Sequence, residues 1–363
     1  MSGLSFEIRN PIDSGWYADP EARFYNGEYI IYATKSLPFD EQKNQVCWTS
    51  PDLTNWTRHD DIIDMSGFPW ARRAVWAPTA VEKNGLYYYV FATNDIHSEA
   101  EKGGLEIAVS SDPTGPFRAL LDRPLVNGFH NGAQPIDAHL FKDDDGTVYL
   151  LFGGWKHCNI AVMNDDMTGF VPFPSGEIFR EITPADYVEG PCMFKKDGKY
   201  YFLWSAGGWT TGTYHVNAAS APSPFGPFDD HYEILSTGDS TIANGPGHNG
   251  YLHIPEEDLH IVPAPEGFCQ HGLETFVQLH AQYLPGPQGE LLRQTADARA
   301  HLQNAGVFVK PCAFRNVLGH PGCSQEVLTH GLGEAELVPL QKGLYFSNIS
   351  QIHFLSFSIF SKA

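Results

Sequence analysis

Four segments of the chain share one pattern, in which a polar turn is followed by an aromatic-rich apolar run. The turn is Asn-Gly or Asp-Gly in every case, and the segments span residues 26–32, 84–90, 145–151 and 197–203. Asn-Gly and Asp-Gly favour type I′ hairpin turns, because both central residues of such a turn need positive φ. An apolar run also precedes each turn, so each segment is predicted to form at least a β-hairpin.

The hairpins recur at a nearly constant period. Their turn glycines, Gly27, Gly85, Gly146 and Gly198, are 58, 61 and 52 residues apart. After each hairpin comes a loop with an aromatic residue: Trp56, Phe117, Phe170 and Phe228. Strand repeats of this length predict propeller blades of roughly four strands each. A β-sandwich is the structural alternative, but it needs no such period.

A weaker fifth unit begins near Gly247, with predicted strands at residues 248–254 and 259–262. We therefore predict an all-β, five-bladed β-propeller as the catalytic domain over residues 1–262, with the fifth blade incomplete. The hairpin motifs then stop. Residues 263–363 are predicted to be an atypical, poorly ordered tail, in which the apolar stretch 344–361 has no clear partner. Residues 4–8 are a candidate for the strand that closes the ring.

Three acidic residues lie in phase with the repeat. Asp19, Asp137 and Glu189 precede their turn glycines by 8, 9 and 9 residues. A shared phase in a propeller predicts a shared place, at the start of the innermost strand and facing the central channel. Like charges brought together cost free energy unless function requires them. Two carboxyl groups that flank a glycosidic bond, with a third that raises the pKa of the acid, are typical of a glycosidase.

The motifs around these acids resemble those of glycoside hydrolase family 43 over about residues 8–262. They are Tyr17-Ala18-Asp19-Pro20, Trp76-Ala77-Pro78, Pro135-Ile136-Asp137, Val188-Glu189-Gly190-Pro191 and Gly247-His248-Asn249. The resemblance implies that Asp19 is the general base, Glu189 the general acid, and Asp137 the residue that tunes and orients Glu189. It also implies inversion of configuration, with release of xylose or arabinose from plant cell-wall oligosaccharides and polysaccharides.

Three further residues are candidates for substrate binding. The resemblance favours Trp76 as a wall of the sugar pocket, although a core tryptophan would fit the same pattern. Trp16, just before the first inner strand, is a second candidate. The resemblance places His248 near the substrate and near a metal ion, often calcium, that it reaches partly through water. The chemistry itself requires no cofactor.

Charge and composition narrow the class of partner. The chain has 43 Asp+Glu against 23 Lys+Arg, a net charge of −20, which argues against nucleic acid and anionic membranes as partners. No apolar stretch is long enough to span a membrane. The N-terminus shows no signal peptide, which predicts a cytoplasmic protein, or a secreted one if a leader precedes it. An oligosaccharide substrate is compatible with this charge, and the oligomeric state stays open.

Two other functions were weighed. A retaining fructosidase, also a five-bladed propeller, would carry Asn-Asp-Pro and Arg-Asp-Pro motifs, whereas Ala18 precedes Asp19 and Ile136 precedes Asp137 here. A catalytically impaired carbohydrate-binding propeller would not need all three acids. The sequence does not separate β-xylosidase from α-L-arabinofuranosidase or arabinanase activity, because the two pentoses present similar hydroxyl groups.

Overall fold

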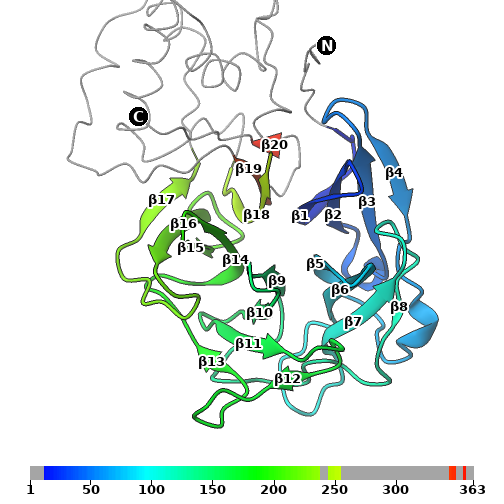
Figure 1. Cartoon of the computed structure of the whole chain (residues 1–363). Helices are drawn as coiled ribbons and strands as arrows, with labels where there is room; N and C mark the ends of the chain where they lie inside the picture. Colours follow the sequence, from blue (N-terminus) through cyan, green and yellow to red (C-terminus); the bar gives the residue numbers. More distant parts are fainter. Residues whose placement is uncertain (1–11, 238–243, 255–342, 349–354, 357–363) are drawn as a thin grey trace, which may run out of the picture.

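The computed structural model describes residues 12–237, 244–254, 343–348 and 355–356. These residues form antiparallel sheets that surround a central channel, as in a β-propeller (Figure 1). Within the described part of the chain, no helix has the length and apolar character needed to cross a membrane. The predicted all-β propeller is therefore confirmed.

Four of the sheets are complete blades of four or five strands. The first blade contains β1 (Tyr17–Tyr25), β2 (Glu28–Lys35), β3 (Gln45–Ser50) and β4 (Thr57–Asp60). The second contains β5 (Trp76–Lys83), β6 (Leu86–Thr93), β7 (Gly104–Ser110) and β8 (Arg118–Ala119). The third contains β9 (His139–Lys142), β10 (Val148–Phe152), β11 (Asn159–Met163), β12 (Phe170–Val171) and β13 (Arg180–Glu181). The fourth contains β14 (Glu189–Lys196), β15 (Lys199–Ala206), β16 (His215–Ala221) and β17 (Tyr232–Leu235).

The remaining sheet has three strands, so the predicted ring of five blades is not confirmed. It contains β18 (Gly247–His253), β19 (Gly343–Asn348) and β20 (Leu355–Ser356). β19 belongs to the stretch for which the sequence indicated no partner, yet it pairs antiparallel with β18. The predicted strand at 259–262 and the candidate closing strand at 4–8 lie outside the described residues. The boundary at residue 262 stays a prediction for the same reason.

The predicted hairpin turns hold in three of the four repeats. Both central residues have positive φ in the turns Asn26-Gly27, Asn84-Gly85 and Asp197-Gly198. In the third blade only Gly146 has positive φ, and the turn spans 143–147 between the paired residues Lys142 and Val148. That turn is longer because a single left-handed residue closes it, so the type I′ prediction is wrong at this position.

Aromatic side chains fill the space between neighbouring blades. Tyr32 of the first blade lies 5.3 Å from Tyr89 of the second, measured between ring centroids. Phe117, one of the aromatic residues predicted to plug a blade, stacks on Tyr89 at 4.4 Å and is completely buried. Phe228 packs on Phe202 at 5.0 Å in the fourth blade. The contact of Tyr32 with Tyr89 holds two adjacent blades together, whereas the contacts of Phe117 and Phe228 stabilise single blades.

A buried ion pair joins three inner strands beneath the channel mouth. Glu21 is 4% exposed and pairs with Arg23 on the same strand. Its second oxygen lies 3.6 Å from Nδ1 of His139 on β9. Arg23 donates to the carbonyl of Ala80 on β5 at 2.7 Å and to that of Leu140 on β9 at 2.9 Å. The pair therefore links the first three blades through a buried carboxylate and a largely buried guanidinium.

Replacing Glu21 by alanine is expected to destabilise the protein by about 3 kcal/mol, because it leaves the buried Arg23 without its carboxylate. Urea unfolding followed by tryptophan fluorescence measures the change. Glu28→Ala is the matched control, since Glu28 is exposed next to a hairpin turn. Equal unfolding midpoints for wild type and Glu21→Ala would show that the ion pair contributes nothing to stability.

Candidate active site

The inner strand of every sheet carries the same irregularity at its start. One residue there has positive φ, and in four sheets the strand register shifts because two residues face one across the ladder. In the third blade the residue lies just before β9. A bulge of this kind re-aims the local side chain. The five residues, with φ of 53°, 47°, 56°, 64° and 45°, are Asp19, Ala77, Asp137, Gly190 and His248.

This backbone phase corrects the alignment of the acids. The sequence aligned Glu189 with Asp19, but the bulge position of the fourth blade is Gly190. Gly190 precedes its turn glycine by eight residues, as Asp19 does. Glu189 lies one residue earlier, at the position that Trp76 occupies in the second blade. The backbone position of Glu189 in its blade therefore differs from that of Asp19 and Asp137 in theirs.

His248 brings the two bulge carboxylates together. Its Nδ1 lies 3.2 Å from Oδ1 of Asp19 and 3.4 Å from Oδ2 of Asp137. Asp19 also accepts a hydrogen bond from the hydroxyl of Thr34 at 2.8 Å. The backbone N–H of His248 is held by the hydroxyl of Ser205 at 2.7 Å. Side chains of the first blade, the third blade and β18 thus meet at one imidazole.

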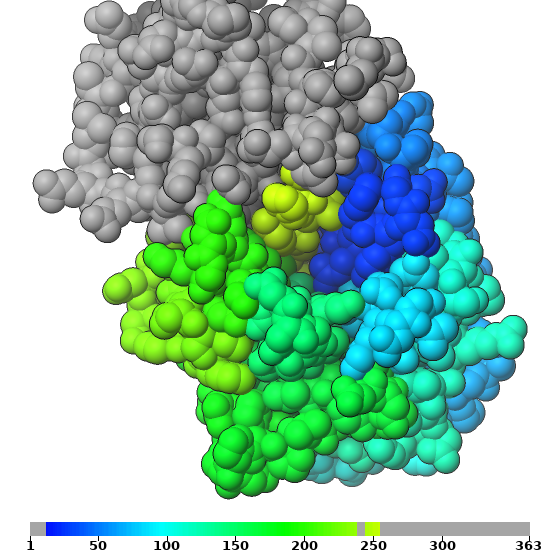
Figure 2. All heavy atoms as spheres, viewed as in Figure 1, coloured from blue at the N-terminus to red at the C-terminus, as the bar shows by residue number. Residues whose placement is uncertain are grey.

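Glu189 joins this group through its neighbours. Oδ2 of Asp137 accepts a hydrogen bond from the backbone N–H of Gly190 at 3.0 Å, directly after Glu189. The hydroxyl of Tyr214 donates to Oε1 of Glu189 at 2.9 Å. Asp137 is 6% exposed. The three acids predicted from the sequence therefore lie on one face of the ring, and Figure 2 shows a hollow where the first blade, β18 and the third blade meet.

The surroundings separate the three carboxyl groups by pKa. Burial raises the pKa of Asp19, but His248 and the Thr34 hydroxyl outweigh it, so the pKa of Asp19 is lowered. Burial, aided by the charges of Glu189 and Asp19, raises the pKa of Asp137 to about 8. Burial and the charge of Asp19 also raise the pKa of Glu189. Asp19 is the group that stays ionised, and Glu189 and Asp137 retain a proton more readily.

The imidazole of His248 is the positive charge of the site. Burial lowers its pKa, but Asp137 and Asp19 outweigh this effect and raise it to about 10. A protonated imidazole has no lone pair for a metal ion. Among the described residues, no group of three or more His, Cys, Asp or Glu side chains is placed to hold a metal. The calcium ion near His248 stays a prediction, and the chemistry below uses none.

The two predicted tryptophans lie in different settings. Trp76 is half-buried at the start of β5, where its indole N–H donates to Oε1 of Gln42 and its ring lies 5.7 Å from that of Phe39. Trp16 is 48% exposed, and its carbonyl accepts a hydrogen bond from the N–H of Ser36 at 3.0 Å. The indole of Trp76 is therefore held in place, whereas Trp16 is open to solvent.

Two residues of the site escaped the sequence analysis. Tyr214, the partner of Glu189, lies outside the repeat motifs, in the loop between β15 and β16. Trp155 is 47% exposed, with positive φ, and its ring lies 4.9 Å from that of Phe129. The next residue, Lys156, donates its backbone N–H to the carbonyl of Val188 at 3.1 Å, one position before the candidate acid. An aromatic residue in a loop after a Gly-Gly pair was the only available signal.

Replacing Asp137 by asparagine is expected to shift the alkaline limb of the rate profile to lower pH. The amide oxygen can still accept the Gly190 N–H, but the second carboxyl group of the pair is lost. Two carboxyl groups that repel each other hold their last proton to a higher pH than either would alone, and part of the singly protonated pair carries that proton on Glu189. Without Asp137, Glu189 therefore loses its proton at lower pH. The measurement is kcat/KM against pH for both proteins. An alkaline limb that stays in place would remove Asp137 from this tuning role.

Comparison with known proteins identifies a family of glycosidases that matches most of this chain. The model of glycosyl hydrolases family 43 matches residues 8–280. A protein of Aspergillus niger named β-D-galactofuranosidase is 38% identical over 263 residues, which cover 70% of this chain and 75% of that protein. Xylosidase/arabinosidase 43A of Humicola insolens is 29% identical over 279 residues, covering 60% of this chain and 80% of that relative.

Solved structures match over the same region. An α-L-arabinofuranosidase from Clostridium thermocellum gives a TM-score of 0.54 at 27% identity, covering 65% of this chain and 78% of that one. A β-xylosidase/α-arabinofuranosidase from a compost microbial metagenome, solved with xylotriose, gives a TM-score of 0.56 at 23% identity over 69% and 86% of the two chains. The second likeness shows a shared fold.

Proposed function

The chain belongs to glycosyl hydrolases family 43, and from this premise we propose that it hydrolyses the glycosidic bond of a pentose, xylose or arabinose, in plant cell-wall oligosaccharides, with inversion of configuration. The observation that carries the proposal is the opposite pKa shift of two carboxyl groups around one site. The pKa of Asp19 is lowered and that of Glu189 is raised. Hydrolysis needs one carboxylate and one carboxylic acid at the same pH.

Each acid takes one proton transfer in this mechanism. Asp19, ionised beside His248, removes a proton from the water that attacks the anomeric carbon. Glu189 gives its proton to the glycosidic oxygen as the bond to the leaving group breaks. Asp137, whose own pKa is raised, shares a proton with Glu189 and so keeps a proton available to it, and it accepts the N–H of Gly190. After product release, one proton moves from Asp19 to Glu189 through solvent, which restores the starting state.

Aromatic side chains supply the apolar surfaces for the sugar. We propose Trp76 as a wall of the pocket that holds the sugar to be released, because its indole is fixed by Gln42. Trp155 lies beside the Glu189 segment and is exposed, which suits contact with the leaving part of the substrate. Trp16 stays a candidate for contact at the rim, since nothing fixes its orientation among the described side chains.

The sugar itself is the open part of the proposal. The relatives that match include proteins named xylosidase/arabinosidase and β-D-galactofuranosidase. Galactofuranose is therefore the second candidate, favoured by the relative with 38% identity. Arabinofuranose shares its five-membered ring, whereas xylose in xylan has a six-membered ring.

The test is a panel of 4-nitrophenyl glycosides of β-D-xylopyranose, α-L-arabinofuranose and β-D-galactofuranose. The expected result is hydrolysis of one or both pentosides with the largest kcat/KM, and no hydrolysis by the matched Glu189→Gln protein on natural oligosaccharides. Preference for the galactofuranoside would replace the pentose. Binding of oligosaccharides without hydrolysis of any substrate would favour the carbohydrate-binding alternative.

A further inference from the structure

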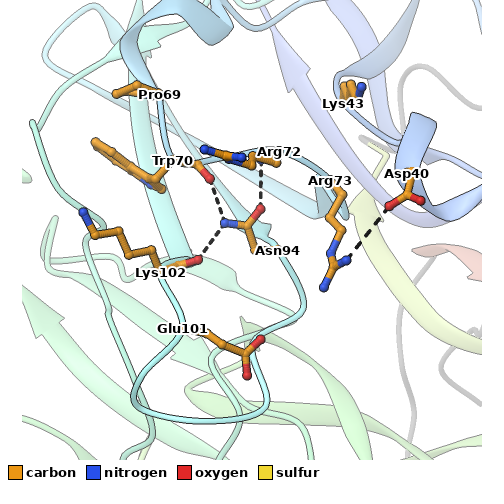
Figure 3. Close-up of a pocket in the computed structure, with 9 residues that line it drawn as sticks. All are labelled: Asp40, Lys43, Pro69, Trp70, Arg72, Arg73, Asn94, Glu101 and Lys102. Carbon is orange, nitrogen blue, oxygen red and sulfur yellow. Dashed lines mark hydrogen bonds and ion pairs between the residues drawn. The ribbon is translucent and has the colours of Figure 1, made fainter.

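A second pocket of about 700 Å³ lies between the first two blades (Figure 3). It is formed by the loop that contains η1 (Phe39–Glu41), the loop before β5, and the loop between β6 and β7. The side chains that matter below are Lys43, Trp70, Arg72, Arg73, Asn94 and Lys102. A monosaccharide fits in a pocket of this size, since ligand sites typically span roughly 300 to 1,000 Å³.

The pocket has a positive net charge, although the chain as a whole is strongly acidic. Four of its nine lining residues are Lys or Arg and two are acidic, whereas the whole chain has 23 basic and 43 acidic residues. Arg73 lies 4.0 Å from the carboxylate of Asp40. Within the described ranges, no ion pair involves the side chain of Lys43, Arg72 or Lys102. Three cations without partners favour an anionic ligand.

The acidic residue on the opposite side is already engaged. Oε1 of Glu101 accepts hydrogen bonds from the backbone N–H of His97 at 3.1 Å and from the hydroxyl of Ser98 at 3.0 Å. Glu101 therefore braces its own loop. Its carboxylate keeps its negative charge, but Glu101 and Asp40 together offset only two of the four cations, so the net charge that a ligand meets stays positive.

Asn94 fixes two of the three loops relative to each other, the loop before β5 and the loop between β6 and β7. Its side-chain N–H₂ donates to the carbonyl of Trp70 at 2.9 Å and to that of Lys102 at 2.6 Å, while its oxygen accepts from the N–H of Arg72 at 2.9 Å (Figure 3). Asn94 has φ of 68°, in the left-handed region that asparagine tolerates. The pocket is thus assembled before any ligand arrives, which lowers the entropic cost of binding.

One wall of the pocket is an aromatic ring whose polar atom is satisfied from behind. The indole N–H of Trp70 donates to Oε1 of Glu106 at 2.6 Å, and Glu106 is completely buried. The same oxygen accepts from the hydroxyl of Thr93 at 2.8 Å. The ring of Trp70 is half-buried and fixed, so an apolar face stands beside the cations. A free inorganic anion makes no apolar contact with the ring of Trp70, whereas a sugar ring packs against it.

Side-chain contacts through Phe39 connect the pocket to Trp76, the proposed wall of the active-site pocket. The guanidinium of Arg73 lies 4.9 Å from the ring centre of Phe39, and the ring of Phe39 lies 5.7 Å from that of Trp76. Trp76 also follows Arg73 by only three residues. A branched saccharide bound at the carboxyl groups can therefore extend past Trp76 toward Arg72 and Lys102.

We propose that this pocket is a subsite for a sugar residue that bears a carboxylate, a uronic acid, on the same branched oligosaccharide whose bond is cleaved at Asp19 and Glu189. The inference rests on the proposed function and deepens it by naming an acidic substrate class. A guanidinium matches a carboxylate with two parallel hydrogen bonds, and Trp70 receives the face of the sugar ring.

The experiment compares two xylo-oligosaccharides of equal length, one with a glucuronic-acid branch and one without. Their affinities are measured by titration calorimetry with the Glu189→Gln protein, which leaves them uncleaved. The branched form is expected to bind about tenfold more tightly, and Arg72→Gln or Lys102→Gln in the same background to remove most of that difference. Arg118→Gln is the matched control, because Arg118 is exposed on β8 and lies 4.0 Å from Asp64. It should preserve the difference.

Equal affinity of the two oligosaccharides would overturn the proposal. Inorganic phosphate that binds the pocket as tightly as the branched oligosaccharide, and loses affinity in Arg72→Gln, would make it a site for free anions and overturn it too. The nitrophenyl panel separates this inference from the proposed function. Hydrolysis without a preference for the acidic branch removes the subsite alone, whereas an Arg72-dependent preference without hydrolysis removes the catalytic proposal and supports the subsite.

Discussion

Replacing Glu189 by glutamine is expected to reduce kcat on xylo- or arabino-oligosaccharides by roughly 10²- to 10⁴-fold, which is the range that a general acid contributes. The amide keeps the shape of the side chain and a partner for the Tyr214 hydroxyl, but it has no proton to give. A sugar hydroxyl is a poor leaving group and depends on that proton. An activated aryl leaving group departs as a stable anion, so dinitrophenyl glycosides should lose much less rate.

Glu177→Gln is the control for the Glu189 variant. Glu177 is a surface carboxylate that pairs with Arg180 at 2.8 Å, so the same chemical change there should leave kcat unaltered. The decisive comparison is the ratio of kcat for the aryl and natural substrates in each protein. An equal loss on both classes of substrate would exclude Glu189 as the proton donor and leave it a binding role.

The sequence predicts the fold well because its signals are local. Asn-Gly and Asp-Gly set hairpin turns through the conformations of two residues, and the period between them depends only on chain length. The longer turn at 143–147 has the same dipeptide as the turn at 197–198, and its three extra residues are visible only from the strand pairing. The partner of β18 could not be predicted either, because Gly343 lies about ninety residues further along the chain.

Only part of the candidate site could be predicted, because sequence motifs record local signals and not contacts between distant residues. Asp19 and Asp137 share the left-handed position at the start of the inner strand, but their spacings from the turn glycines, 8 and 9 residues, do not separate Asp137 from Glu189. Glu189 was placed one residue out of phase, since an acidic residue was expected where the backbone requires the flexibility of Gly190. The ion pairs of His248 join separate sheets, and the hydrogen bond of Tyr214 joins residues 25 positions apart in the fourth blade, so a local motif cannot reveal either contact.

His248 explains how three acids are tolerated in one place. Two of them face its imidazole, whose pKa is raised to about 10. The single positive charge lowers the pKa of Asp19 but does not overcome burial at Asp137, whose pKa is about 8. The positive charge of His248 among three acids thus produces the two protonation states that hydrolysis needs. Asp19 is ionised, and a proton is retained near Glu189.

Replacing Asp19 by asparagine is expected to reduce kcat by roughly 10²- to 10⁴-fold on every substrate, whatever its leaving group, because the attacking water loses its base. This independence from the leaving group distinguishes Asp19 from Glu189. Asp61→Asn is the matched control, since Asp61 is exposed and pairs with Lys35 at 2.7 Å. A loss confined to poor leaving groups would assign the acid role to Asp19 instead.

The wild-type product decides whether Asp19 activates water or attacks the sugar itself. If it is a base, water adds directly and proton NMR should detect the inverted anomer first, before mutarotation. This requires room for a water molecule, with the Asp19 and Glu189 carboxyl groups about 6.5–9.5 Å apart. If the retained anomer appears first, Asp19 forms a covalent intermediate and the chain works as the fructosidase-type enzymes do. Asp19 would still be essential in that case, so the stereochemistry of the product, and not the loss of rate, separates the two mechanisms.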